Sequence, residues 1–392
     1  MALTLQQLLT QVTGQLSPHS ETASLDAQVL IAHFLEKPRS WVLAHPEFVM
    51  DDQQSGHIAQ AVVRLQHGEP LPYLIAHWEF YGLDFHLTPD VLIPRPETEL
   101  LVERALAWLQ DHPGPRHVID VGTGSGCIAI SLGVNHPDVH LLLTDLSLPA
   151  LNVARINAEK YGLAGRCRFQ QADLLEGVTE TFDLLCANLP YIPSDVLLHL
   201  PVADGEPHLA LDGGPQGLDP ITRLLDQARD HLEPGGVILL EIESGHGNQV
   251  KHAAQDIYPA CRVKVLKDLS GYDRCVEITP STLIVHLCQG NEWQAAQDAG
   301  VFTDTSLDQA GFIHCSRPDQ LLKVANHYYR GVPDMKVLWI EPTKVSSEIR
   351  WETANGSSFP HVYGPINLAA VISVTGLPAD CDGDYYQINL PV

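Results

Sequence analysis

The chain has 392 residues, of which 45% are hydrophobic and 18% are charged, a composition that excludes a disordered or low-complexity protein. Acidic residues outnumber basic ones by 48 to 23, and the formal net charge of −25 argues against direct DNA binding. No apolar run reaches the roughly 20 residues of a membrane helix. A signal peptide starts with a positively charged region, and this chain has no Lys or Arg before Lys37. The eight cysteines show no C-x-x-C spacing, so we expect a cytoplasmic protein with free thiols and no membrane partner.

Residues 1–80 are predicted to form a helical bundle. Apolar residues recur at helical spacing, first at Leu5, Leu8 and Val12 and then in two further groups, and prolines separate the groups. The stretch 79–87 then alternates like a strand, which is expected to lead into the next part of the chain.

From residue 96 the pattern changes to alternating helices and strands. Helices are expected near 97–110, 147–161 and 219–232. The expected strands cover residues 117–121, 140–144, 167–170, 183–187 and 236–242, with a closing pair at 261–266 and 274–278. This alternation predicts an α/β fold with a doubly wound, mainly parallel sheet that helices cover on both faces.

A further part of the chain begins after Pro280-Ser281-Thr282. It starts again with a strand at 283–287, continues with helices and a strand at 337–340, and does not repeat the sequence before it. The expected domains are therefore a helical domain over residues 1–80, an α/β domain over 81–280 and an α+β domain over 281–392.

A glycine-rich loop follows the strand at 117–121. Its residues are Gly122-Thr123-Gly124-Ser125-Gly126. Glycines allow a sharp turn and a close approach of the backbone to a ligand, although an ordinary strand–helix turn is the alternative. Ligands of doubly wound sheets bind at the carboxyl ends of the strands, and Asp145 ends the second strand, where an acid can accept hydrogen bonds from ribose hydroxyls.

The turn after the fourth strand suggests an acceptor site. It reads Asn188-Leu189-Pro190-Tyr191. A planar amide or aniline-type nitrogen is a poor nucleophile, and the Asn188 side-chain oxygen with the Leu189 carbonyl could bind its two N–H groups and orient it. Pro190 would stiffen the turn, and Tyr191 offers a face to a planar group or a cationic methyl. The alternative is an ordinary loop, and no metal is needed for this chemistry.

The glycine loop, with Asp120 two residues before it, resembles motif I of the class I S-adenosylmethionine-dependent methyltransferases. The resemblance implies that S-adenosylmethionine binds to the loop, Asp145 and Asn188, with Asp173 and Leu174 near its adenine. The turn at 188–191 resembles the Asn/Asp-Pro-Pro-Tyr motif of methyltransferases that act on glutamine amides or on adenine N6, with Leu189 in place of the first proline.

Other segments resemble the release factor glutamine methyltransferases (the PrmC/HemK family). They are 79–83, 91–99, 206–207, 210–214, 234–236 with 241–242, and 268–274. This resemblance covers about residues 1–279. It implies methylation of the glutamine in the Gly-Gly-Gln motif of class 1 peptide chain release factors, with the N-terminal helices docking the protein substrate. Arg95 and Glu97 are expected either to line the acceptor cleft or to form a structural ion pair.

Residues 283–392 resemble a small bacterial domain family of uncharacterised function. The matching segments are 311–316, 325–329 and 359–365. That family has been likened to ADP-ribosyltransferase folds. Structural residues, a nucleotide-type pocket and a metal site near His286 and Cys288 are the alternatives, and convergence of His286, His314, His361 and Tyr363 on one cleft would discriminate between them.

Two other functions fit residues 1–280 less well. An adenine N6 methyltransferase would need a basic target-recognition surface, and no segment of the chain supplies one. A non-catalytic binding module on a decayed methyltransferase fold is disfavoured by the intact glycines, Asp145, Asn188 and Tyr191. The sequence therefore favours a protein-glutamine N5-methyltransferase.

Overall fold

The computed structural model describes residues 3–354 and 357–391. The chain divides into two compact units, neither of them a continuous segment. The first contains the chain up to Leu106, with Asp120–Asp173 and Asn188–Gly217. The second contains Ala107–Ile119, Leu174–Ala187 and the chain from Leu218 onward. The glycine loop and the turn at 188–191 thus belong to the same unit.

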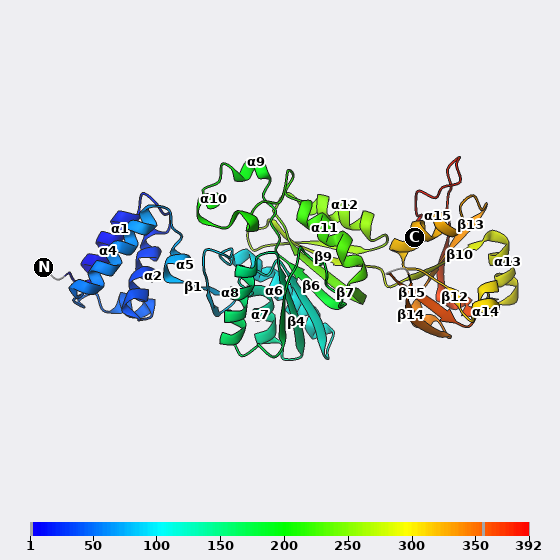
Figure 1. Ribbon diagram of the computed structural model, residues 1–392, viewed down its shortest axis with the longest axis horizontal. Helices are drawn as coiled ribbons and strands as arrows, with labels where there is room; N and C mark the ends of the chain where they lie inside the picture. The colour runs from blue at the N-terminus through cyan, green and yellow to red at the C-terminus, as the bar shows by residue number, and fades with distance from the viewer. Residues whose placement is uncertain (1–2, 355–356, 392) are drawn as a thin grey trace. The chain divides into compact units, whose positions relative to one another are not determined.

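The predicted N-terminal bundle is confirmed (Figure 1). Its helices are α1 (Leu5–Leu16), α2 (Ala23–Leu35), α3 (Arg39–Ala44), α4 (Asp52–Gln66) and α5 (Leu71–Ile75). Helix α1 begins at a capping box, in which the Thr4 side chain accepts from Gln7 N and the Gln7 side chain accepts from Thr4 N. Apolar residues at helical spacing, such as Leu5, Leu8 and Val12, fill the core of the bundle.

The single strand expected over 79–87 is wrong, because this stretch folds as a hairpin. Strand β1 (His77–Phe80) pairs antiparallel with β2 (Leu83–His86). The two residues between them, Tyr81 and Gly82, have φ of 53° and 71°. Positive φ at both central residues is typical of the two-residue turn that matches the twist of paired strands.

The central sheet confirms the expected α/β fold. Its seven strands are β3 (Arg116–Val121), β4 (Val139–Asp145), β5 (Cys167–Gln171), β6 (Phe182–Ala187), β7 (Leu232–Glu241), β8 (Arg262–Lys267) and β9 (Asp273–Thr279). They lie in the order β5-β4-β3-β6-β7-β9-β8. Pairs β4–β5 and β6–β7 are parallel, whereas β9 is antiparallel to both β7 and β8, so the sheet is mixed.

The strand order reverses between β3 and β6, and in such sheets ligands bind at this switch point. The glycine loop follows β3, and the turn at 188–191 follows β6. Helix α6 (Glu99–Asp111) precedes β3, and the helices between strands of the sheet include α7 (Cys127–Asn135), α8 (Leu148–Lys160), α11 (Asp219–Gln227) and α12 (Gly247–Ile257).

The C-terminal part is an α+β arrangement, as expected. Strands β10 (Ile284–Gln289), β13 (Met335–Ile340) and β17 (Val371–Gly376) form one sheet in the order β10-β13-β17. A second sheet has the order β12-β15-β14, and β11 pairs with β16. The remaining elements here are α13 (Gly290–Ala299), β11 (Val301–Phe302), α14 (Thr305–Ala310), β12 (Ile313–His314), α15 (Leu321–Tyr328), β14 (Glu348–Ala354), β15 (Ser357–Tyr363) and β16 (Ile366–Asn367).

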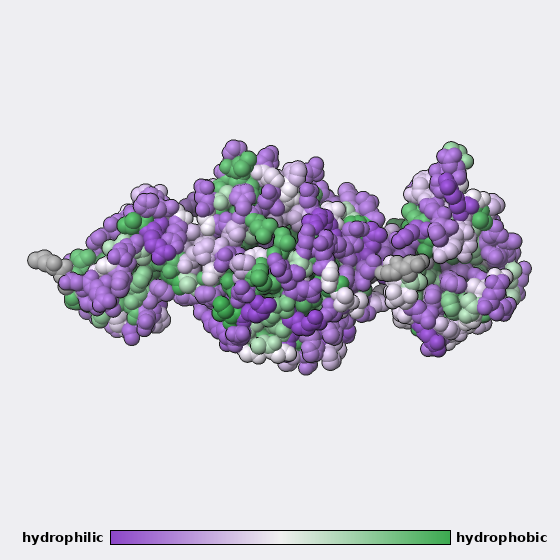
Figure 2. Space-filling view, viewed as in Figure 1, coloured by the Kyte–Doolittle hydropathy of each residue, from purple (hydrophilic) through white to green (hydrophobic). Residues whose placement is uncertain are grey.

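The segment 194–210, after the turn at 188–191, exposes apolar side chains. It contains α9 (Ser194–Leu197), α10 (Val202–Gly205) and the 3₁₀ helix η2 (His208–Ala210). Figure 2 shows hydrophobic residues on the surface at the place of α9 in Figure 1. The exposed ones in this segment are Val196, Leu198, Leu200 and Leu209, and Leu198 is the most exposed of the four at 74%.

All eight cysteines are free, as expected from their spacing. In the part of the chain that the structure describes, no helix combines the length and the apolar character that a membrane crossing requires.

Candidate active site

The glycine loop adopts a backbone that other residues would strain. Gly122, Gly124 and Gly126 have φ of 70°, 53° and 80°. A Cβ on Gly122 would lie 2.9 Å from Leu189 Cδ2, and one on Gly126 would lie 2.8 Å from Ile130 Cδ1. A Cβ on Gly124 would meet open space. The first and third glycines are therefore required by packing, whereas the middle one leaves room for a ligand.

Hydrogen bonds fix this loop to the end of β4. The N–H groups of Gly122 and Thr123 both donate to the Thr144 carbonyl, each at 2.9 Å. Gly124 N donates to Asp145 Oδ2 at 2.9 Å. Burial raises the pKa of Asp145, although backbone hydrogen bonds from residues 147, 124 and 146 oppose this shift. The carboxylate keeps unused lone pairs, so it can still accept hydrogen bonds from a ligand.

Asp120 supports the loop from inside the protein. It is fully buried, and its Oδ2 accepts from Thr123 Oγ1 at 2.6 Å and from Ala129 N at 3.3 Å. Its Oδ1 has no hydrogen-bond partner among the described residues. Burial raises the pKa of Asp120 to about 6. The Asp120 carboxylate thus joins the glycine loop, through Thr123, to the first turn of α7, through Ala129.

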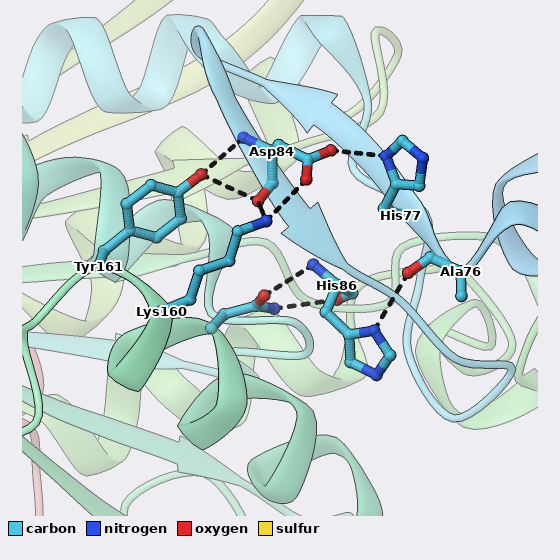
Figure 3. A network of polar contacts seen from close by, with 7 residues as sticks. Ala76, His77, Asp84, His86, Lys160 and Tyr161 are labelled. Carbon is cyan, nitrogen blue, oxygen red and sulfur yellow. Dashed lines mark hydrogen bonds and ion pairs between the residues drawn. The ribbon is translucent and has the colours of Figure 1, made fainter. Parts of the chain in front are cut away.

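Hydrogen bonds join the hairpin β1–β2 to the C-terminal end of α8 (Figure 3). Asp84 lies between His77 Nδ1, at 2.6 Å, and Lys160 Nζ, at 2.7 Å, and its backbone N–H donates to the Tyr161 hydroxyl. Burial would raise the pKa of Asp84, but the hydrogen bonds from Lys160 and His77 hold it below its usual value.

Asn157 on α8 links the hairpin to the glycine loop. It is fully buried, and its Oδ1 accepts from His86 N at 2.7 Å. Its Nδ2 donates to the His86 carbonyl at 3.0 Å and to the Ser125 carbonyl at 2.9 Å. Sequence analysis missed this residue, because a lone Asn in an amphipathic helix shows no motif.

The acceptor turn lies against the glycine loop. A Cβ on Gly122 would meet the Leu189 side chain and would be 4.0 Å from the Asn188 carbonyl oxygen. Leu189 is buried, whereas Asn188, Pro190 and Tyr191 are half-buried. Asn188 Nδ2 donates to Thr98 Oγ1 at 3.2 Å. The glycine loop, which is expected to bind the cofactor, therefore lies beside the turn that is expected to bind the acceptor.

The segment 210–214 braces this turn. Ile192 N donates to the Leu211 carbonyl at 3.1 Å, and Gly213 N donates to the Ile192 carbonyl at 2.9 Å. A Cβ on Gly213 would lie 2.7 Å from Tyr191 Cα and 2.8 Å from the Pro190 carbonyl oxygen. Only glycine fits there without displacing the turn.

Arg95 forms an ion pair, but its partner is Glu206 rather than Glu97. The Glu206 carboxylate also accepts from Ile93 N at 3.0 Å, whereas the Glu97 side chain is exposed. Arg95 and Glu206 therefore fix the segment before η1 (Pro96–Thr98), a short 3₁₀ helix.

Asp173 and Leu174, expected near the adenine, follow β5. Asp173 is half-buried, and Leu174 is buried with φ of 59°. The two residues fall in different compact units.

In the C-terminal domain, three of the four residues expected to converge lie together. Rings of His314 and His361 are 5.3 Å apart, and His361 Nδ1 and the Tyr363 hydroxyl both contact the Glu352 carboxylate, at 2.5 and 3.0 Å. His286 is buried behind them, with Nδ1 2.7 Å from the His314 carbonyl. Over residues 3–354 and 357–391, no group of three or more metal-binding side chains is present.

Comparisons with known protein families match three parts of the chain. The matched descriptions are "PrmC N-terminal domain" at residues 7–75, "Methyltransferase small domain" at 97–202 and "Protein of unknown function (DUF952)" at 287–374.

Individual proteins match as well. A release factor glutamine methyltransferase from Moorella thermoacetica is 42% identical over 276 residues, which are 70% of this chain and 97% of that protein. The crystal structure of a release factor-specific protein-(glutamine-N5) methyltransferase from Alicyclobacillus acidocaldarius is 30% identical and covers 50% of this chain and 99% of that chain, with a TM-score of 0.32. Protein CC0527 from Caulobacter crescentus is 31% identical and covers 26% of this chain and 93% of that chain, with a TM-score of 0.25.

Proposed function

The chain belongs to the release factor glutamine methyltransferase family, and on this premise we propose which of its residues carry out the reaction. The substrate is the glutamine of the Gly-Gly-Gln motif in class 1 peptide chain release factors, and the product is its N5-methylated amide. S-adenosylmethionine, when bound, supplies a methyl group activated on a sulfonium centre. In the net reaction this methyl group would replace one N–H hydrogen of the glutamine, which would leave as a proton, and loss of the methyl group would leave the sulfonium sulfur as a neutral thioether.

The residues at the switch point fit this cofactor. Gly124 borders open space, the loop is fixed by backbone hydrogen bonds, and Asp145 keeps lone pairs for ribose hydroxyls. Residues 122–126, with Asp145, would bind the cofactor, and Asp173 with Leu174 would contact its adenine. The glycine loop needs no side chain for this role, because its backbone approaches the ligand directly.

Asn188 and Leu189 would orient the glutamine nitrogen. The amide nitrogen is a weak nucleophile, because its lone pair is delocalised into the carbonyl group. Acceptance of its two N–H groups by Asn188 Oδ1 and the Leu189 carbonyl would place it against the methyl group and increase its electron density as charge develops. Leucine in place of proline keeps this carbonyl, and its buried side chain packs against Gly122.

The contact between Gly122 and Leu189 is the observation that carries this proposal. It brings the acceptor turn to the cofactor loop, as direct methyl transfer between two bound reactants requires. Pro190 and Tyr191 complete the turn, with the Tyr191 ring beside the planar amide.

Two surface features support a protein substrate. The segment after the acceptor turn exposes Val196, Leu198 and Leu209, which a bound protein could cover. The net charge of −25 favours encounter with a basic partner. The helical domain over residues 1–80 would provide a further docking surface, and Arg95 would act by fixing the segment that leads to Thr98, which contacts Asn188.

The test is incubation of the full chain with isotope-labelled S-adenosylmethionine and a purified class 1 release factor, followed by mass spectrometry of the Gly-Gly-Gln peptide. We expect one methyl group on the glutamine, none on a release factor with that glutamine replaced, and none on DNA. The N188A variant should lose methyl transfer and retain cofactor binding by calorimetry. Label on DNA, or none on the release factor, would refute the proposal.

A further inference from the structure

The Asn188 carboxamide has two chemically different ends. Its oxygen can accept an N–H group, whereas its nitrogen can only donate. The glutamine nitrogen of the substrate presents N–H donors. If the carboxamide were turned round, its NH₂ group would face these donors and no hydrogen bond could form.

Thr98 is the partner of the nitrogen end. Asn188 Nδ2 donates to Thr98 Oγ1 at 3.2 Å, and the two residues are 90 positions apart in the chain. Within residues 3–354 and 357–391, Asn188 Oδ1 has no hydrogen-bond partner. It is also absent from the fully buried oxygens that lack a partner, so it keeps some exposure to solvent. The nitrogen end is therefore anchored in the protein, and the oxygen end is available to a substrate.

The Thr98 hydroxyl is itself held in place. Only 2% of the residue is exposed, and it ends η1, where its N–H donates to the Arg95 carbonyl at 3.1 Å. The Arg95–Glu206 ion pair fixes the preceding segment. A β-branched side chain in a packed environment has few rotamers, so the oxygen that Asn188 contacts has a defined position.

We infer that Thr98 is a positioning residue that holds the Asn188 carboxamide through Nδ2, so that Oδ1 is free to accept from the reacting nitrogen. This inference rests on the role proposed for Asn188. A hydroxyl can also donate, so Thr98 fixes the position of the carboxamide, and the substrate N–H then selects the orientation with the oxygen outward. Acceptance of the Nδ2–H by Thr98 also polarises the carboxamide and makes Oδ1 a better acceptor.

The test compares T98V, which replaces the hydroxyl by a methyl group of similar size, with T98S, which keeps the hydroxyl. We expect T98V to lower kcat for release factor methylation about tenfold, the factor associated with one hydrogen bond. The KM for S-adenosylmethionine should stay within twofold of the wild type. T98S should restore kcat to within about threefold of the wild type, because the acceptor atom is retained.

S131A is the matched control. Ser131 is also fully buried, it lies on α7, and its hydroxyl has no hydrogen-bond partner among the described residues. Loss of this hydroxyl should leave kcat unchanged. If T98V does not fold, as shown by the absence of a cooperative unfolding transition, then T98A is compared with T98S instead.

Full activity of T98V or T98A would overturn the inference, and so would equal loss of kcat in T98S. A rise in the KM for the cofactor without a change in kcat would show a role in cofactor binding and would also overturn it. A wild-type chain that does not methylate release factors would refute the proposed function itself, which is a separate outcome.

Discussion

Replacement of Asn157 by Asp should disconnect the hairpin from the glycine loop. The change keeps the shape of the side chain but removes both Nδ2–H donors. In the wild-type chain these donors bind the carbonyls of His86 and Ser125. Each lost hydrogen bond in a buried site costs about 1–1.5 kcal/mol, so the two together should lower the free energy of unfolding by about 2–3 kcal/mol. A buried carboxylate facing two carbonyl oxygens at about 3 Å adds to this cost.

The pH dependence has a definite sign. Burial and the two carbonyls would raise the pKa of the new carboxyl above its value in the unfolded chain, so protonation favours the folded state. The stability deficit of N157D should therefore be largest at neutral pH and should shrink as the pH falls toward 4.

Urea unfolding of the full chain at pH 7 and pH 5 would measure this deficit in stability. Calorimetry would measure the affinity for S-adenosylmethionine, which should fall because the Ser125 carbonyl loses its hydrogen bond from Asn157. The control is N152D, since Asn152 is exposed on the same helix. Wild-type stability and wild-type cofactor affinity in N157D at neutral pH would refute the reasoning.

Three further predictions concern single residues. D120N should be more stable than the wild type by up to about 3 kcal/mol at pH 7.5. Burial raises the pKa of Asp120 to about 6, so ionisation of its carboxyl group destabilises the folded state as the pH rises from about 4 to 6. Chemical denaturation across this range should show that the difference in stability vanishes at low pH. G122A should destabilise the chain by about 1–2 kcal/mol, because φ is 70° and the new Cβ would lie 2.9 Å from Leu189; a thermal midpoint equal to that of the wild type would contradict this. H361Q should raise the pKa of His314, which burial and the nearby His361 both lower; an NMR titration with an unchanged His314 midpoint would exclude the charge effect.

Local sequence features predicted two elements of the proposed active site. The glycine spacing after a buried strand predicted the loop proposed to bind the cofactor, and the acid at the end of the next strand predicted a role for Asp145. Hydrophobic periodicity and the positions of glycines and prolines likewise predicted the helical bundle, the strands of the central sheet and the strand near 283–287. The hairpin at 77–86 was missed, because alternation continues across Tyr81 and Gly82 and hides the turn.

The sequence alone determined where the glycine loop and most helices and strands form, since glycines, prolines and apolar periodicity act on the backbone within a few residues. Only the tertiary structure decided which distant side chains meet. Arg95 pairs with Glu206 across 111 positions, Asn188 contacts Thr98 across 90, and Asn157 contacts Ser125 across 32. These contacts depend on how the strand order and loop packing bring separate segments together, and no local pattern in the chain encodes them.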